Sequence, residues 1–444
     1  MGRLEAHSPS TPDRLDRPSE DSLLFELFPA LATGVEWRLE RTERALELLG
    51  DPHRAYASLH VGGTNGKGSV TAMLASIQSA MGRHAGCYIS PHLVSFPERI
   101  SVAGKPLSEH ALREYAGEAR EAVTKCGLTF FEATTVLALH SFAREGVEVA
   151  ALEVGLGGRL DATNVVRPEV SAVTNIAMDH SDYLGETLME IAREKAGIMK
   201  PGVPFVTTES TPEVLALFQE LAAEVGAPMW RVPLGAVRDI LIAPDRTSFR
   251  LDTRAWGELD VVTPLVGRHQ ATNAALAVAA CEHLTHPLRP TAAAVLRGIG
   301  SVAYRGRDEV VRLEGRTWLF DVAHNPAGVA SLADTLDRLD LPRPLVALVG
   351  VLRDKDWGAM LPPLLSRADH VILSQPPTVP LNRRWDPAEV ARSVPTAAAL
   401  GVVPDFAAAL DEAASLAGAG TVVVMGSVHT VGGAMKLLGV APIG

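Results

Sequence analysis

The chain is poor in cysteine, has no excess of basic residues and contains no long apolar run, and each shortage excludes a class of protein. Its three cysteines (Cys87, Cys126 and Cys281) stand far apart without a CxxC motif, so we expect a reducing cytoplasm and no disulfide framework. No segment is long and apolar enough to span a bilayer, and the N-terminus lacks the apolar stretch of a secretion signal. The formal net charge of -11 argues against a nucleic-acid partner, which would need a basic face.

The chain does have enough apolar sequence for two or three domains. Of its 444 residues, 47% are apolar and 21% are charged, proportions typical of a soluble globular protein with a substantial core. Residues 1–20 are rich in Pro, Ser, Asp and Arg, which predicts a disordered tail.

The most informative segment is the glycine-rich stretch VGGTNGKGSV at residues 61–70. A short apolar run precedes it, and helical spacing of apolar residues follows at Val70, Met73, Leu74, Ile77 and Met81. In the order strand, glycine loop, helix, backbone N–H groups face phosphates, the lysine neutralises charge and the hydroxyl reaches magnesium. The strict GxxxxGK[ST] pattern fails because Gly68 separates Lys67 from Ser69. The placement between a strand and a helix still predicts nucleotide binding.

Predicted strands and helices alternate along the chain, as in parallel sheets covered by helices. We expect buried strands at residues 147–154 and 170–176, a helix at 212–225 and hairpins within 240–262. A break rich in Gly and Arg at 298–307 divides the chain into domains at 21–302 and 303–444. The predicted fold class is α/β: an N-terminal P-loop-type doubly wound domain and a smaller, Rossmann-like C-terminal domain. A ligand cleft is expected between the two.

Polar side chains follow several predicted strands, and ligands of an open parallel sheet bind outside the carboxyl ends of its strands. Ser90 follows the segment 87–89, Glu153 ends the strand 147–154, and His180 comes shortly after the strand 170–176. Oxygen atoms of Ser90 and Glu153, with phosphate oxygens and water, would suit Mg²⁺. Taken singly, such residues are usually a solvated carboxylate and a loop-capping histidine. Their succession beside a phosphate loop favours a metal site.

Other candidates have weaker support from the residues alone. The spacing around Lys195 favours a solvated helix lysine. Asp321 and His324 follow a strand of the second domain, where an aspartate commonly bonds a ribose hydroxyl. Arg307 lies in the break between the domains, where a cation could meet ATP phosphates on closure; a surface arginine is an equal alternative.

Taken together, these segments resemble the folylpolyglutamate synthase and dihydrofolate synthase family, within the Mur ligase superfamily. The resemblance covers nearly the whole chain beyond the tail, and the series of motifs is far more specific than any one of them. The matching segments, in the family's order, are GTNGKGS, ISPHLVSFPERI, TFFEATT, LEVGLGGRLDATN, TNIAMDHSDYLG, REKAGI, GRHQATN, DVAHNP and GVLRDKDW.

The resemblance implies an ATP-dependent ligase that adds L-glutamate to a folate or dihydropteroate carboxylate through an acyl phosphate. It implies that residues 21–302 bind ATP and the pterin, and that 303–444 close over the nucleotide and glutamate. Catalytic roles are implied for Lys67, His180 and Lys195, with one magnesium ion held by Ser90 and Glu153 and a second by His180. Lys195 occupies a position that is carbamylated in the family. Carbamylation would replace the ammonium group by a hard oxygen ligand. This implication reverses the interpretation drawn from spacing.

The resemblance also implies two sets of ligand contacts. The ATP-binding residues are Thr64, Asn65, Gly66, Lys67, Gly68, Ser69, Asn273, Arg307 and Asp321. The pterin-binding residues are Glu36, Trp37, Arg38, Thr129, Phe130, Phe131, Glu132, Leu160, Asp161 and Ala162. We expect a cytoplasmic monomer whose partners are small molecules (ATP, L-glutamate, and dihydropteroate or a reduced folate), with neither nucleic acid nor membrane.

Two departures and two alternatives stay open at this point. Arg305 stands where the family's Pro-Gly-Arg has proline, and His429 stands where tyrosine is frequent. The alternatives are a Mur-type cell-wall ligase and a P-loop nucleotide hydrolase or switch without ligase activity. The segments TFFE and LGGRLDATN favour folate substrates. The motifs do not distinguish chains with one glutamate-adding activity from chains with both.

Overall fold

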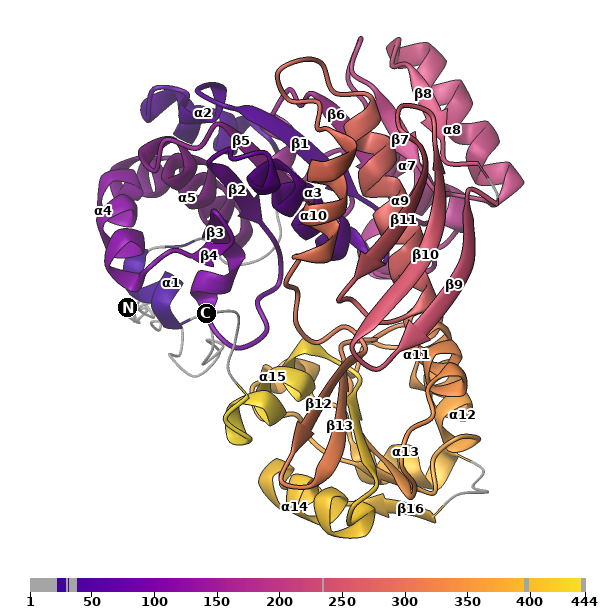
Figure 1. Cartoon of the computed structure of the whole chain (residues 1–444). Helices are drawn as coiled ribbons and strands as arrows, with labels where there is room; N and C mark the ends of the chain where they lie inside the picture. Colours follow the sequence, from indigo (N-terminus) through magenta and orange to yellow (C-terminus); the bar gives the residue numbers. More distant parts are fainter. Residues whose placement is uncertain (1–21, 29–30, 32–37, 234, 395–398, 441–444) are drawn as a thin grey trace, which may run out of the picture.

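The structure is a computed structural model, and it describes residues 22–28, 31, 38–233, 235–394 and 399–440. The predicted tail at residues 1–20 therefore lies outside the described residues. Two α/β domains lie one above the other, with the first in indigo to salmon and the second in orange to yellow (Figure 1). The predicted fold class is confirmed.

The first domain is built on an eight-stranded sheet in the order β4-β3-β2-β5-β1-β6-β7-β8. Its centre is parallel: β1 (Ala57–Gly62) pairs with β5 (Val149–Glu153) on one side and with β6 (Val170–Val173) on the other. Only the edge strands β3 and β4 run antiparallel to their neighbours. The remaining strands are β2 (Ala85–Tyr88), β3 (Ile100–Val102), β4 (Lys105–Pro106), β7 (Phe205–Thr207) and β8 (Met229–Arg231).

Helices cover both faces of this sheet, because its central strands are apolar on both sides. Along β5, Val149 and Ala151 face one core, whereas Ala150 and Leu152 face the other. The first core is covered by α3 (Lys67–Ala80), α9 (Arg268–Glu282) and α10 (Ala292–Gly300). The second is covered by α1 (Ser22–Leu27), α2 (Glu40–Leu48), α4 (Glu109–Cys126) and α5 (Phe130–Arg144). Further helices are α6 (Ser181–Leu184), α7 (Leu188–Ala196) and α8 (Pro212–Val225), and the 3-10 turns are η2 (Pro52–Arg54), η3 (Phe96–Arg99) and η4 (Ala162–Val165).

The predicted hairpins form a small antiparallel sheet in the order β11-β10-β9. Its strands are β9 (Val237–Ala243), β10 (Arg246–Thr253) and β11 (Gly257–Thr263). Alternate residues of β10 are buried, and Phe249 and Leu251 join the core shared with α9. Apolar alternation thus attaches this sheet to the first domain by one face only.

The second domain has six strands in the order β12-β13-β17-β14-β15-β16, all parallel except β12. The strands are β12 (Glu309–Leu313), β13 (Arg316–Asp321), β14 (Leu345–Val349), β15 (His370–Leu373), β16 (Ala399–Val402) and β17 (Thr421–Met425). One face is covered by α11 (Pro326–Arg338), α12 (Trp357–Leu365) and α13 (Pro387–Ser393), and the other by α14 (Phe406–Ala417) and α15 (Val428–Leu437). The turn η5 (Leu381–Arg383) precedes α13.

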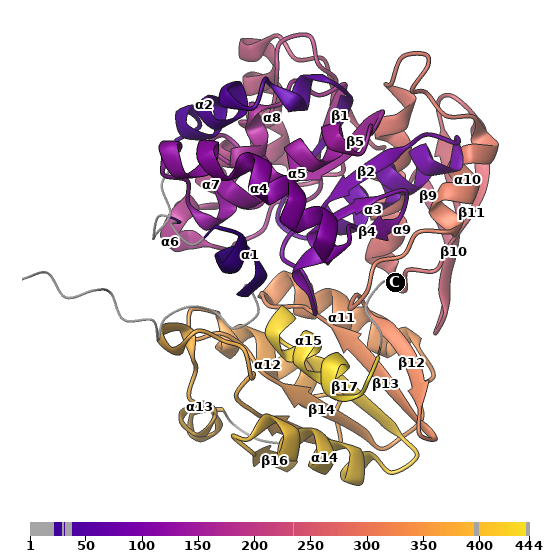
Figure 2. The ribbon, with the colours of Figure 1, turned by 90° about the vertical axis from the view of Figure 1, so that its left-hand side faces the viewer.

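The two domains meet at a loop of the first and a helix of the second. Leu93, in the loop after β2, packs within the core cluster of the second domain. A Cβ atom on Gly432 of α15 would lie 1.9 Å from Leu93 O, so only glycine permits this approach. Figure 2 shows α11 and α15 on the side of the second domain that faces the first. The sequence break at 298–307 covers the last residues of α10 and most of the segment that leads to β12.

Replacing Gly432 by alanine should weaken this joint, because the new methyl group overlaps a backbone carbonyl that cannot rotate away. We expect a loss of about 1–3 kcal/mol in the free energy of unfolding, measured by urea denaturation. Gly117→Ala is the matched control: Gly117 also lies inside a helix, but its added Cβ would meet nothing within 4 Å. That variant should gain about 0.5–1 kcal/mol from helix propensity. Equal stability gains in both variants would show that the contact at Gly432 is not tight.

Candidate active site

The glycine-rich loop joins β1 to α3 and has the shape of a phosphate cradle. Gly63 and Gly66 adopt φ values of 129° and 85°, which favour glycine. A Cβ atom on Gly63 would lie 1.9 Å from Thr174 Oγ1, so the loop also needs glycine for close packing. Lys67 is the first residue of α3, and its Nζ donates a hydrogen bond of 3.0 Å to Thr64 O. The lysine therefore lies across the loop, beside the free N–H groups of the helix N-terminus.

The segment after β6 holds this loop in place. Thr64 N donates to Asn175 O at 2.8 Å, and Asn65 N donates to Asn175 Oδ1 at 3.0 Å. Thr64 Oγ1 also donates to Ala177 O at 3.2 Å and accepts from Ala177 N at 3.0 Å. The same segment continues to Asp179 and His180, so the predicted histidine is fixed relative to the cradle.

The structure brings Ser90 and Glu153 together. Glu153 ends β5 beside Val61 of β1, is 3% exposed, and accepts a hydrogen bond of 2.8 Å from Ser90 N. Burial raises the pKa of Glu153, and the charge of Lys67 opposes that shift. A cation would relieve this buried carboxylate. Within the described ranges no three His, Cys, Asp or Glu side chains form a metal cluster, so water, phosphate or the Ser90 hydroxyl would complete the ligand set.

His180 and Lys195 are both placed close enough to Lys67 for its charge to affect their pKa values. Burial is the main cause that lowers the pKa of His180 to about 4, so its imidazole is neutral at pH 7 and keeps a lone pair for a metal. Lys195 is 4% exposed and donates a hydrogen bond of 2.9 Å to Gly63 O. Burial first and Lys67 second lower its pKa to about 7. The expectation of a solvated helix lysine, drawn from spacing, was wrong because α7 turns this side chain inward.

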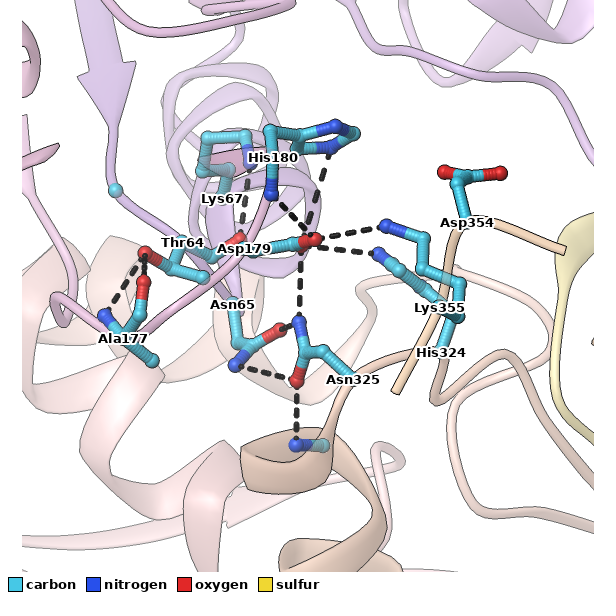
Figure 3. A network of polar contacts seen from close by, with 12 residues as sticks. Thr64, Asn65, Lys67, Ala177, Asp179, His180, His324, Asn325, Asp354 and Lys355 are labelled. Carbon is cyan, nitrogen blue, oxygen red and sulfur yellow. Dashed lines mark hydrogen bonds and ion pairs between the residues drawn. The ribbon is translucent and has the colours of Figure 1, made fainter. Parts of the chain in front are cut away.

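A network of polar contacts around Asp179 links the two domains (Figure 3). Its carboxylate lies 2.7 Å from Lys355 Nζ, accepts a hydrogen bond of 3.0 Å from Asn325 Nδ2, and lies 3.4 Å from His324 Nε2. Asn325 also exchanges amide hydrogen bonds of 3.0 and 3.4 Å with Asn65 of the loop. Burial alone would raise the pKa of Asp179, but the hydrogen bond to His324 and the positive charges around it hold the pKa well below its usual value.

Sequence reasoning missed Asp179, Asn325 and Lys355 as site residues. Two signals were available: all three residues lie in segments that match the family, and Lys355 follows β14 as Asp321 ends β13, at the same carboxyl edge of the second sheet. Their pairing across the domains joins residues 146 and 176 positions apart in the chain, a distance that no local pattern encodes.

Three predicted nucleotide residues lie outside the loop; Asn273 lies directly against it, and Arg307 is linked to it through Tyr304. A Cβ atom on Gly66 would lie 2.4 Å from Asn273 Oδ1, so the Asn273 amide abuts the cradle. Arg307 lies over the ring of Tyr304 at 4.8 Å, and the Tyr304 hydroxyl packs on Gly68, where a Cβ would lie 2.0 Å away. This contact explains why glycine follows Lys67. Arg305 instead pairs with Glu309.

Asp321, the third of these residues, ends β13 with both carboxylate oxygens held by the backbone. Its Oδ1 accepts a hydrogen bond of 2.8 Å from Ala323 N, and its Oδ2 accepts one of 2.9 Å from Asp308 N. The side chain is 7% exposed. The structure therefore fixes its orientation at the carboxyl edge of the second sheet.

Several predicted pterin residues surround Gly155, next to Ser90. A Cβ on Gly155 would lie 3.1 Å from Asp161 Oδ2, 3.8 Å from Ser90 Oγ and 3.9 Å from Phe131 Cδ1. The side chain of Phe131 is exposed, as a stacking surface would be. Leu160 and Ala162 flank Asp161, and Phe130 is partly buried in the core below.

Three further predicted pterin residues have a different environment. Glu132 is buried, caps α5 through Thr129 and pairs with Arg41 at 3.0 Å, which is a structural role. Arg38 is exposed. Glu36 and Trp37 lie outside the described residues.

Comparison with known proteins places the chain among ligases. Residues 61–281 match the Mur ligase middle domain, and residues 306–428 match the Mur ligase glutamate ligase domain. A probable bifunctional folylpolyglutamate synthase/dihydropteroate synthase of Haloferax volcanii is 36% identical over 412 residues, 88% of this chain and 47% of that protein. The chain thus spans about half the length of that relative.

A second relative is matched over nearly its full length. The dihydrofolate synthase/folylpolyglutamate synthase of Mycobacterium tuberculosis is 33% identical over 470 residues, 97% of this chain and 96% of that protein. The solved structure of Mycobacterium tuberculosis folylpolyglutamate synthase complexed with ADP has a TM-score of 0.86 and 33% identity, covering 96% of this chain and all of that one.

The Asp179–Lys355 pair should be strongly coupled, because both side chains are only 7% exposed. Asp179→Asn leaves Lys355 without its carboxylate and should cost about 3 kcal/mol in the free energy of unfolding. Adding Lys355→Met should restore part of this loss, giving a coupling energy above about 1 kcal/mol in a double-mutant cycle. The exposed pair Asp334–Arg338 is the control, and its coupling should be much weaker because solvent screens it. Equal coupling in the two pairs would contradict a buried interdomain link.

Proposed function

Because the chain belongs to the folylpolyglutamate synthase and dihydrofolate synthase family of Mur ligases, we propose that it is an ATP-dependent ligase. It adds L-glutamate to the carboxylate of a folate or of dihydropteroate through an acyl-phosphate intermediate. The observation that carries the proposal is the convergence of Glu153, His180 and Lys195 around Lys67, in a cradle to which both domains contribute.

The cradle would bind the triphosphate of ATP. Loop N–H groups and the N-terminus of α3 face the phosphate oxygens, and Lys67 exchanges its contact with Thr64 O for the outer phosphate. Asn273, Arg307 and Asp321 would hold the rest of the nucleotide. When bound, magnesium ions would neutralise developing charge on the transferred phosphate, with Ser90, Glu153, His180 and a carbamylated Lys195 as their protein ligands.

The reaction has two steps. A carboxylate oxygen of the folate or dihydropteroate attacks the γ-phosphorus atom, the bond to the β-phosphate oxygen breaks, and ADP leaves. Alignment and charge neutralisation by Lys67 are the main requirements of this transfer. The amine of L-glutamate then attacks the acyl carbon, phosphate leaves with one former carboxylate oxygen, and an amide remains. Holding both reactants in line lowers the barrier by roughly 7–11 kcal/mol at best.

The second domain would keep water away from the acyl phosphate. The Asp179 network and the Asn65–Asn325 amide pair connect it to the cradle itself, so its closure is tied to the state of the loop. Closed domains exclude water that would otherwise hydrolyse the intermediate. The pterin would lie beside Phe131 and Asp161, near Gly155.

We further propose that the chain works as a cytoplasmic monomer with small-molecule partners. No helix among the described residues has the length and apolarity needed to cross a membrane.

A product assay with single acceptors tests this function. The wild-type chain with ATP, magnesium and L-glutamate should convert dihydropteroate or tetrahydrofolate to a product one glutamate longer, with equimolar ADP.

Lys67→Ala should lower the rate at least about a hundredfold, because charge neutralisation at the phosphate is lost. Lys105→Ala, at an exposed lysine of β4, is the control and should retain the wild-type rate. ATP hydrolysis independent of glutamate and acceptor would instead indicate a nucleotide switch, and turnover only with a cell-wall nucleotide-peptide would indicate a different Mur ligase.

Carbamylation of Lys195 should depend on pH around its lowered pKa of about 7. Only the neutral amine reacts with CO₂, so the carbamate should disappear as the pH falls below 7 and persist above it. Carbon-13 NMR with labelled bicarbonate should show one carbamate signal that Lys195→Arg removes. Lys195→Ala should lose activity that short carboxylates partly restore. Full activity of that variant without additives would rule out a carbamate ligand.

A further inference from the structure

Asp308 is a fully buried carboxyl group to which the function described so far gives no role. It lies one residue before β12, is 0% exposed and has a φ of 48°, a left-handed conformation that Asp tolerates better than most residues. Its backbone N–H donates the 2.9 Å hydrogen bond to Asp321 Oδ2. The charge of Asp321 also acts on the pKa of Asp308, so the two carboxyl groups lie close together in one buried site.

Elements from both domains pack against this carboxyl group. Thr335 Oγ1 of α11 donates to Asp308 Oδ2 at 2.5 Å. At the start of α9, Gly267 has a φ of 113° and approaches so closely that its Cβ would lie 2.9 Å from Asp308 Oδ2. Asp308 Oδ1 is buried and accepts no hydrogen bond from any described donor. A proton shared with Asp321 would satisfy this atom.

A chain of contacts continues from Asp308 to the other side of the nucleotide cradle. His269 Nδ1 lies 3.9 Å from Asp308 Oδ2, and Gln270 Nε2 lies 3.0 Å from His269 Nε2. Gln270 Oε1 in turn accepts a hydrogen bond of 3.1 Å from Asn273 Nδ2, and Asn273 abuts Gly66. If Gln270 donates, the proton of the neutral His269 ring sits on Nδ1 and faces Asp308. Asp308 therefore stands between the two predicted nucleotide contacts Asp321 and Asn273.

We propose that Asp308 is a positioning residue of the nucleotide site, which orients Asp321 toward ATP and links it across the domain joint to Asn273. This inference rests on the proposed function, because it takes both of those residues as nucleotide contacts. It adds a residue that touches neither the nucleotide nor the reacting atoms and acts through Asp321.

The protonation state explains how a second carboxyl group helps rather than repels. Burial and the neighbouring Asp321 raise the pKa of Asp308 well above its usual value. A protonated Asp308 can donate to Asp321, whose other lone pairs stay available for the hydroxyl groups of a nucleotide. If both carboxyl groups were ionised, their repulsion would push Asp321 out of position.

Two substitutions separate the side chain of Asp308 from its backbone. Both Asp308→Gly and Asp308→Asn suit a φ of 48°, and both keep the N–H that binds Asp321. Asn imitates a protonated carboxyl group, whereas Gly removes it. In calorimetric titration with ADP, Asp308→Gly should raise the Kd about tenfold and Asp308→Asn less than about twofold. The KM for ATP should follow the same order, while the KM for glutamate stays within about twofold of wild type.

The matched control is Asp51→Gly, an aspartate with a φ of 56° before β1, at the opposite end of that strand from the cradle. Its ADP affinity should equal that of wild type. Wild-type ADP affinity in Asp308→Gly, even with a lowered melting temperature, would overturn the positioning role. An Asp308→Asn variant as weak as Asp308→Gly would also overturn it, because a charge would then be required.

Thr335→Val carries the test if Asp308→Gly does not fold, since it keeps Asp308 and removes the hydroxyl that bonds Asp308 Oδ2 and, within α11, Ser331 O. It should weaken ADP binding about threefold, and unchanged binding would overturn the proposal. Failure of the proposed function has a different signature: the wild-type chain itself would bind no ADP, which would remove the premise together with the inference.

Discussion

Two lysines bind neighbouring carbonyl groups of one glycine-rich loop, and the arrangement of the site depends on this concentration of positive charge. Lys67 Nζ lies 3.0 Å from Thr64 O, and Lys195 Nζ lies 2.9 Å from Gly63 O. Burial and mutual repulsion make this costly, as the lowered pKa of Lys195 shows. Such a loop favours the binding of a polyanion, because the positive charge of the two lysines would stabilise a bound phosphate group.

The second domain responds to the same loop. Asn325 contacts Asn65 of the cradle and also Asp179, which holds Lys355. On the opposite side, Tyr304 lies against Gly68 and supports Arg307. Asn325, Lys355 and Tyr304 all come after α10 in the chain. Each of them contacts either the glycine-rich loop or the segment after β6 that holds this loop in place. Under the proposed function these contacts would couple binding at the cradle to the position of the second domain, which suits a reaction whose intermediate must be protected from water.

Much of the fold could be predicted from the sequence because its signals are local. The helix α8 has the predicted bounds, and the predicted strands at residues 147–154 and 170–176 contain β5 and β6, since each is a short apolar or periodic run between clear breaks. The loop and its lysine could be predicted for the same reason. The inward orientation of Lys195, the Asp179–Lys355 pair and the Tyr304–Gly68 contact could not, because they depend on packing between segments far apart in the chain. Spacing alone gave the wrong environment for Lys195, and only the family resemblance corrected it.

The central claim is that ATP activates an organic carboxylate as an acyl phosphate, and the fate of one oxygen atom tests it most directly. A folate or dihydropteroate labelled with oxygen-18 in the reacting carboxylate can be turned over with ATP and L-glutamate, and the released inorganic phosphate analysed by mass spectrometry. Our account predicts one labelled oxygen in each phosphate released, because the bridging oxygen leaves with the phosphate. Unlabelled phosphate accompanying amide formation would contradict it.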